Sequence, residues 1–190
     1  NLAYAYESAG RLGEAIPLYE EVLADRVRVL GDDHPDTLVS RGNLAGAYES
    51  AGRLGEAIPL YEQVLADSVR VLGEDHPHTL ASRGSLAAAY QAVGRLGEAI
   101  PLYEQVLADR VRVLGDDHPH TLASRNNLAH AYESAGRLGE AIPLYEEVLA
   151  DCVRVLGADH PHTLTSRRNL EAAMRARESG SASASGVAEE

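Results

Sequence analysis

Three short His-Pro segments carry the residues of this sequence whose spacing could hold a metal ion. Residues 75–78 read Asp-His-Pro-His, and the same four residues recur at 117–120 and 159–162. Imidazole and carboxylate groups are ordinary zinc ligands. Proline separates the two imidazoles of each segment, and no second pair is placed to complete a site. A helix start, with Asp or the first His as N-cap and Pro as first helical residue, is the better interpretation, so we expect no metal.

Nucleophilic chemistry has fewer candidates still. Cys152 is the only cysteine, and it stands where the other copies of its segment have Arg26, Ser68 and Arg110. We expect an exposed or half-exposed thiol there, and we find no Ser/His/Asp or Cys/His set. Residues 52–55 (Gly-Arg-Leu-Gly) form a turn between helices rather than a phosphate loop, because no strand precedes them and no Lys-Ser/Thr follows. The sequence therefore predicts no catalytic residue and no cofactor, so we do not expect an enzyme.

Charge and composition exclude several classes of partner. The 190-residue chain is 45% hydrophobic and has a formal net charge of −12, whereas nucleic acids and anionic membrane surfaces require a cationic face. No apolar run approaches the ~18 residues of a membrane span, and the N-terminal residues lack the pattern of a secretion signal. One cysteine forms no intrachain disulfide, which fits a reducing compartment. We expect a cytoplasmic protein that binds neither nucleic acid nor membrane.

An internal repeat of 42 residues positions all of these side chains. Four nearly identical units occupy residues 1–42, 43–84, 85–126 and 127–168. Each unit predicts two helices, with one beginning at Pro77 and stopping at Gly94, and the other beginning near Arg53 and stopping at Gly73. The second helix is apolar over a wide arc, which must be covered from two sides. Stacked repeats provide that cover.

The C-terminal residues differ from the units before them. Residues 161–178 predict one more first helix, in which Glu171 and Met174 replace the usual Ala and Tyr, as a capping helix would require. Residues 179–190 are rich in Ser, Gly and Ala and predict a disordered tail. The N-terminus begins inside a first helix, so we expect a fragment of a longer array.

The repeated motif resembles a known family. Leu44-Ala45-x-x-Tyr48 followed by Ala57-x-x-x-Tyr61 is similar to the tetratricopeptide repeat, and the long unit with Gly-x-Asp-His-Pro resembles the kinesin-light-chain type. It also resembles the arrays of bacterial STAND-type regulators. The resemblance implies an all-α fold, an α-solenoid in which antiparallel helix pairs form a right-handed superhelix. Arginine occupies the position where the common pattern has Trp, and we expect only the stem of this side chain to be buried.

Differences between the copies indicate where a ligand would bind. Residues 36, 39, 42 and 46 differ most from their copies in the other repeats, and their steps of three, three and four place them on one face of the first helix. In the resembling family this face lines the concave groove that holds peptides, and Asn43 matches a position whose amide holds the ligand backbone. A ligand with a carboxylate end near Arg168 and a basic part over a row of glutamates would fit this lining. The alternative is that exposed positions drifted after duplication.

The predicted function is a non-catalytic scaffold that binds a protein or peptide in this groove, as part of a larger regulator or adaptor. The alternative is structural, with copies stacking head to tail through their terminal helices. The predicted ligand-binding residues are Tyr4, Glu7, Asn43, Glu49, Gln91, Asn126, Asn127, His130, Glu133, Arg168 and Asn169.

Overall fold

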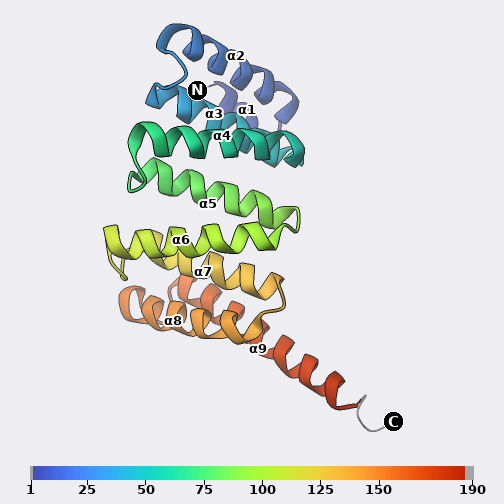
Figure 1. Cartoon of the computed structure of the whole chain (residues 1–190). Coiled ribbons are helices and arrows are strands. Elements are labelled where there is room, and N and C mark those ends of the chain that lie inside the picture. Colours follow the sequence, from blue (N-terminus) through green and yellow to red (C-terminus); the bar gives the residue numbers. More distant parts are fainter. Residues whose placement is uncertain (1, 187–190) are drawn as a thin grey trace. The chain divides into compact units, whose positions relative to one another are not determined.

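The structure is a computed structural model that describes residues 2–186 of the chain, with side chains as far as Ser179. The described part is built of helices and contains no strand (Figure 1). Contacts divide it into two compact units, Asn1–Leu102 and Tyr103–Glu190, and the boundary falls inside one helix. One continuous repeat domain over residues 1–178 stays a prediction.

The helices follow the predicted repeat, with a first helix of 16 residues and a second of 19 in each complete repeat. In chain order they are α1 (Leu2–Ser8), α2 (Leu12–Leu30), α3 (Pro35–Ser50), α4 (Leu54–Leu72), α5 (Pro77–Ala92), α6 (Leu96–Leu114), α7 (Pro119–Ser134), α8 (Leu138–Leu156) and α9 (Pro161–Gly186). Each helix from α1 to α4 contacts the next one along the chain, and α8 contacts both α7 and α9.

The first helices α3, α5, α7 and α9 each start at a His-Pro segment, as predicted. The His76 side chain caps α5 by accepting a hydrogen bond from the backbone N–H of His78 at 3.1 Å, and proline follows as the first helical residue. The Thr79 hydroxyl donates to the carbonyl of Gly73 at 2.8 Å and so ties this start to the end of α4. The same bonds recur in the other His-Pro segments. These histidines therefore act as caps, in agreement with the simpler interpretation.

Small and aromatic residues of the second helices fill the core between stacked helices. Ala57 is fully buried and Tyr61 is 5% exposed, and their copies in the other repeats are equally buried. An alanine at this position lets two helix backbones approach closely, while the tyrosine spans the gap to the neighbouring helix. The wide apolar arc predicted for the second helix is thus covered by first helices.

The arginine at the tryptophan position is buried to its tip, so the expectation that only its stem would be buried is wrong. The Arg41 side chain is 4% exposed, and its guanidinium donates to Asp32 and Asp67, each at 2.9 Å. Two carboxylates supply the charge and the acceptors that a buried guanidinium requires, which is why burial is tolerated. Arg125 repeats this arrangement with Asp116 and Asp151.

The last helix, α9, packs on α8 as predicted for residues 161–178 and then continues to Gly186. The expected disordered tail, 179–190, therefore overlaps this helix over 179–186. Its last four residues lie outside the part of the chain that the structure describes.

Candidate ligand-binding site

The predicted row of acidic residues on the first helices is tied to the core. The buried Tyr61 hydroxyl donates to Glu49 at 2.7 Å, and the corresponding tyrosines donate to Glu7 at 2.6 Å and to Glu133 at 2.7 Å. Burial, together with the bonded carboxylate, raises the pKa of Tyr61 above its usual value. Gln91 occupies the same position in the third repeat, on α5. The glutamates of this row thus hold the second helix through its tyrosine. Only their remaining acceptor positions could bind a ligand.

Exposed asparagines follow the buried arginines along the first helices. Asn43 on α3 and Asn127 on α7 are both exposed, although the leucines that come next, Leu44 and Leu128, are buried. Tyr4, on α1, is 65% exposed. We name the surface that carries these residues the first-helix face, and each unit presents its own part of it.

In the second unit, four predicted residues meet across α7 and α9. The amide nitrogen of Asn169 donates to Asn126 Oδ1 at 3.2 Å and lies 3.4 Å from His130 Nε2. The other ring nitrogen, Nδ1, lies 3.4 Å from Glu133, and the edge of the His130 ring contacts Tyr145. An imidazole that carries a proton on Nδ1 and presents Nε2 to Asn169 satisfies both contacts. We name Asn126, His130, Glu133 and Asn169 the amide–imidazole cluster.

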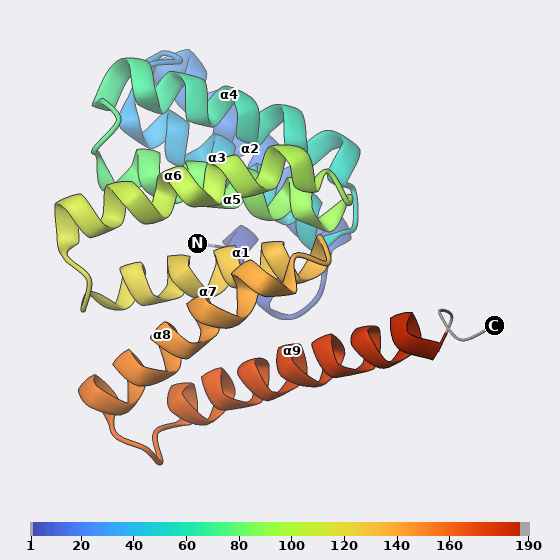
Figure 2. The ribbon, with the colours of Figure 1, turned by 60° about the horizontal axis from the view of Figure 1, so that its bottom comes forward.

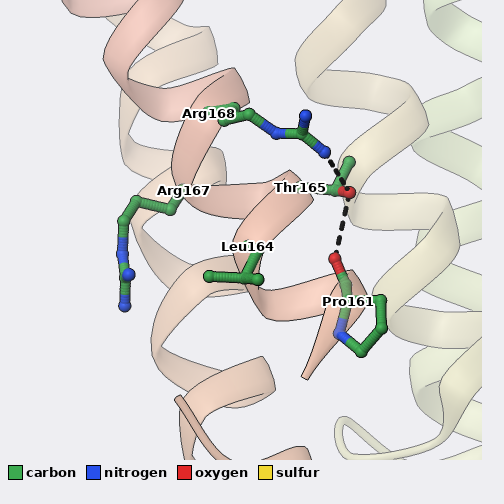
Figure 3. A pocket seen from close by; sticks show the side chains of 5 residues that line it. All are labelled: Pro161, Leu164, Thr165, Arg167 and Arg168. Atoms are coloured by element: carbon green, nitrogen blue, oxygen red, sulfur yellow. Dashed lines mark hydrogen bonds between the residues drawn. The ribbon is translucent and has the colours of Figure 1, made fainter. Parts of the chain in front are cut away.

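Arg168 points elsewhere in this unit. Its guanidinium donates to the Thr165 hydroxyl at 3.1 Å, and both residues line a hollow of about 480 Å³ with Pro161, Leu164 and Arg167 (Figure 3). Figure 3 shows Arg167 extending away from Arg168. The contacts that Arg168 makes with described residues are thus on its own helix and not with the amide–imidazole cluster.

A cavity of about 520 Å³ lies beside the cluster, where α7, α8 and α9 adjoin. Figure 2 shows α8 running beside both of the other helices. Asn126 and the exposed Asn127 form part of the wall, and the buried floor is formed by Leu122, Val148 and Cys152. The cavity therefore leads from the first-helix face into the interior of the unit.

Sequence reasoning missed this cavity, and it misplaced Cys152. The cysteine is 5% exposed, so the expectation of an exposed or half-exposed thiol is wrong. The change of residue size at this position, Arg to Ser to Arg to Cys through the four repeats, was the signal in the sequence. A smaller side chain on the second helix leaves room against the following first helix.

Comparison with known proteins identifies the family. The model of the family described as Tetratricopeptide repeat matches residues 1–68, 51–110, 85–152 and 126–184. The chain belongs to the tetratricopeptide-repeat family. The repeats are an interaction scaffold, and the fold is the all-α solenoid that the sequence predicts, with four repeats and a terminal helix.

Solved structures relate the chain to kinesin-light-chain-type repeats. One is a crystal structure of nearly identical TPR-like repeats assigned to a kinesin light chain of Podosopora anserina. Its sequence is 40% identical to this chain, and the two superpose with a TM-score of 0.85 over 94% of this chain and 84% of that one. A single-residue variant of that protein, also 40% identical with the same shares covered, has a TM-score of 0.86. BtubC (BKLC) from P. vanneervenii is 24% identical with a TM-score of 0.82 over 93% of this chain and 70% of its own, and shows the fold alone. A search of curated proteins gave no match.

The described residues contain no group of three His, Cys, Asp or Glu side chains placed to hold a metal ion. None of the described helices combines the length and the hydropathy needed to cross a membrane.

Proposed function

We propose that the chain is a non-catalytic scaffold, part of a larger cytoplasmic regulator or adaptor, which binds a protein or peptide segment on its first-helix face. In the second unit the ligand would lie over Asn127 and the amide–imidazole cluster. Membership of an interaction-scaffold family supports the class of function.

One arrangement carries this proposal: the exposed Asn127 lies beside the partly exposed amide–imidazole cluster and the cavity. Asn127 is exposed, while the neighbouring Asn126 and Asn169 hold each other at 3.2 Å and are only partly exposed. A fixed amide network pre-organises donors and acceptors, so a ligand backbone loses less entropy on binding there than on a mobile surface. An exposed asparagine amide offers both a donor and an acceptor to an extended peptide.

Selection from a displayed random-peptide library, with the immobilised 190-residue chain as bait, tests this proposal. The affinity of a recovered peptide would be measured by fluorescence anisotropy for the wild type, for Asn127→Ala combined with His130→Ala, and for Glu146→Ala on α8. Glu146 is exposed on a second helix and serves as the matched control. We expect the double variant to weaken binding by about tenfold or more, and the control to leave it unchanged. Equal affinity in all three proteins would place the ligand elsewhere.

Self-association is the second candidate, and one leucine favours it. Leu164 on α9 is 41% exposed, whereas its copies Leu38, Leu80 and Leu122 are at most 7% exposed. A second chain stacking head to tail on α9 would cover this leucine, as second helices cover its copies. Sedimentation velocity over a wide concentration range should then show concentration-dependent assembly that Leu164→Glu abolishes. A monomer at every concentration would exclude this candidate.

A further inference from the structure

The cavity in the second unit occupies a place that other repeats fill with their own arginine. The position held by Cys152 is Arg110 in the third repeat and Arg26 in the first. The Arg110 guanidinium reaches the following first helix, where it donates to the carbonyl of His120 at 3.1 Å and to the Ser124 hydroxyl at 2.8 Å. Arg26 likewise donates to the carbonyl of Asp36 at 2.6 Å. The solenoid thus carries a repeated guanidinium site between a second helix and the next first helix.

The acceptors of this site are retained in the fourth repeat although its arginine is absent. Ser166 corresponds to Ser124, and each hydroxyl donates to the carbonyl four residues earlier at 3.0 Å. Ser166 therefore has the orientation in which Ser124 accepts from Arg110. The sulfur of Cys152 lies 3.7 Å from the Ser166 oxygen, so the position of the missing arginine adjoins this hydroxyl.

The second repeat shows how a small side chain can be compensated, and the fourth repeat lacks that compensation. Ser68 is fully buried, and the imidazole of His78 turns toward it, with Nδ1 at 3.1 Å from the Ser68 hydroxyl. In the fourth repeat the corresponding His162 is exposed and stacks on His160 instead, with ring centroids 5.3 Å apart. The space stays open as the cavity of about 520 Å³, which Cys152, His162 and Ser166 help to line.

Charge and access also suit a cationic occupant. Asp117 forms part of the cavity wall, where its carboxylate already pairs with Arg154, and the chain as a whole has a formal net charge of −12. Arg26 and Arg110 are themselves partly exposed, so the repeated site is open to solvent along one side. In the fourth repeat that opening continues to Asn127 on the first-helix face.

We propose that this cavity binds an arginine side chain of the protein or peptide partner, with its guanidinium in the place that Arg110 occupies one repeat earlier. The proposal rests on the proposed function, because the arginine belongs to the segment bound on the first-helix face. The guanidinium would donate to Ser166 and to the carbonyl of His162, and its stem would lie along Val148 and Leu122. The fourth repeat would then differ from the others in reading one side chain of the ligand.

Titration of the 190-residue chain with N-acetyl-arginine amide, followed by NMR shifts of isotope-labelled protein, tests the proposal. The matched probe N-acetyl-citrulline amide has the same shape without the charge. We expect saturable shifts at Ser166 with a dissociation constant on the order of millimolar for so small a ligand, and at least about tenfold weaker binding of citrulline. Equal shifts with the two probes, or no saturable shift, would overturn the proposal.

Two variants locate the binding. Cys152→Arg places the chain's own guanidinium in the cavity, so it should abolish probe binding while the melting temperature is retained or raised. Cys152→Ala keeps the space and offers no hydroxyl toward which His162 could turn, so it should bind as the wild type does. If Cys152→Arg does not fold, Ser166→Ala removes one acceptor and should weaken probe binding several-fold. Unchanged binding in Cys152→Arg or in Ser166→Ala would place the probe outside the cavity.

The test of the arginine cavity and the test of the proposed function can fail independently of each other. Probe binding that Cys152→Arg abolishes supports the cavity even if Asn127→Ala with His130→Ala leaves peptide affinity unchanged. Peptide binding that depends on Asn127 but not on an arginine in the peptide would leave the first-helix face as the site and refute the arginine cavity.

Discussion

Replacing Arg41 with alanine should destabilise the first unit far more than replacing an exposed arginine of the same unit. The Arg41 side chain is 4% exposed and bridges Asp32, before its helix, to Asp67 on the second helix that follows. Its buried guanidinium therefore links two helices and a loop, and its removal leaves Asp32 and Asp67 without that partner. Arg28 is the matched control, because its side chain is 72% exposed and bonds to the exposed Asp25 at 2.9 Å.

The expected cost follows from the exposure of each partner. Asp32 is 65% exposed and will be hydrated once the arginine is lost, so that bond contributes about 0.5 kcal/mol. Asp67 is 18% exposed and keeps Arg70 at 2.8 Å, so losing its buried charge-assisted bond should cost about 2 kcal/mol. Lost packing of the buried stem adds about 1 kcal/mol. We expect a total of about 3.5 kcal/mol, within the range for breaking a buried pair, against about 0.5 kcal/mol or less for Arg28→Ala.

Urea unfolding followed by circular dichroism measures both effects. Stacked repeats share their stability with their neighbours, so midpoints should be compared only where the slope of the transition is unchanged. Arg41→Met separates the contributions, because it keeps most of the packing and should recover about 1 kcal/mol of the loss. Arg125→Ala repeats the test in the second unit, where the side chain is 9% exposed and has Asp151 at 2.8 Å. Similar midpoints for Arg41→Ala and Arg28→Ala would refute the reasoning.

Three further predictions concern the ends of the helices and the tyrosines. Met174→Tyr should stabilise the fold against urea by about 0.5–1 kcal/mol. In earlier repeats the first-helix tyrosine at this position donates a hydrogen bond to the glutamate that corresponds to Glu146. No change in stability would show that the terminal helix does not reproduce that contact. Gly52→Ala should lower the free energy of unfolding by about 1 kcal/mol, because the backbone φ of Gly52 is +72° although there is open space around an added Cβ. Gly55 is the control, because it is helical and equally open, and Gly55→Ala should cost nothing. Equal effects of the two changes would exclude backbone strain. Burial and a bonded carboxylate raise the pKa of Tyr132 to about 12. The stability that this phenol contributes is therefore complete below about pH 10 and is lost as the pH rises toward 12. Because the chain has nine tyrosines, the absorbance titration of Tyr132→Phe is subtracted from that of the wild type, and a difference that appears at about pH 10 without unfolding would contradict this.

The sequence was sufficient for the architecture because every copy repeats the same local instructions. The second helix ends at a glycine such as Gly73, whose backbone φ is +88°. Three residues later the His-Pro segment caps the next first helix. Each unit therefore carries its own start and stop signals, and the helices begin and end close to where these signals predict. The family pattern added the pairing of helices, which local signals alone do not give.

The candidate site was predicted less completely because contacts between helices depend on side-chain size and direction. Spacing placed Asn126 and His130 on the same face, the family pattern added Asn169, and the structure brings Asn169 within 3.2–3.4 Å of the other two. Spacing also placed Arg168 on that face, yet its guanidinium turns toward Thr165 on its own helix. The cavity depended on the volume of Cys152 relative to arginine, and a periodic pattern of apolar residues contains no information about that volume.

The arginines at the tryptophan position show how a charged residue comes to be buried. Arg41, Arg83 and Arg125 are at most 7% exposed, yet Arg167, the fourth copy, is exposed. The residue type is the same in all four, so propensity and hydropathy predict one outcome for all of them. What changes is the partner: where Arg41 has Asp32 in the preceding loop, Arg167 has Ala158, and no second helix follows α9 within the described residues to supply the other carboxylate. A guanidinium enters this interior only with its carboxylates, so burial of charge in the array is a property of adjoining repeats and not of the residue itself.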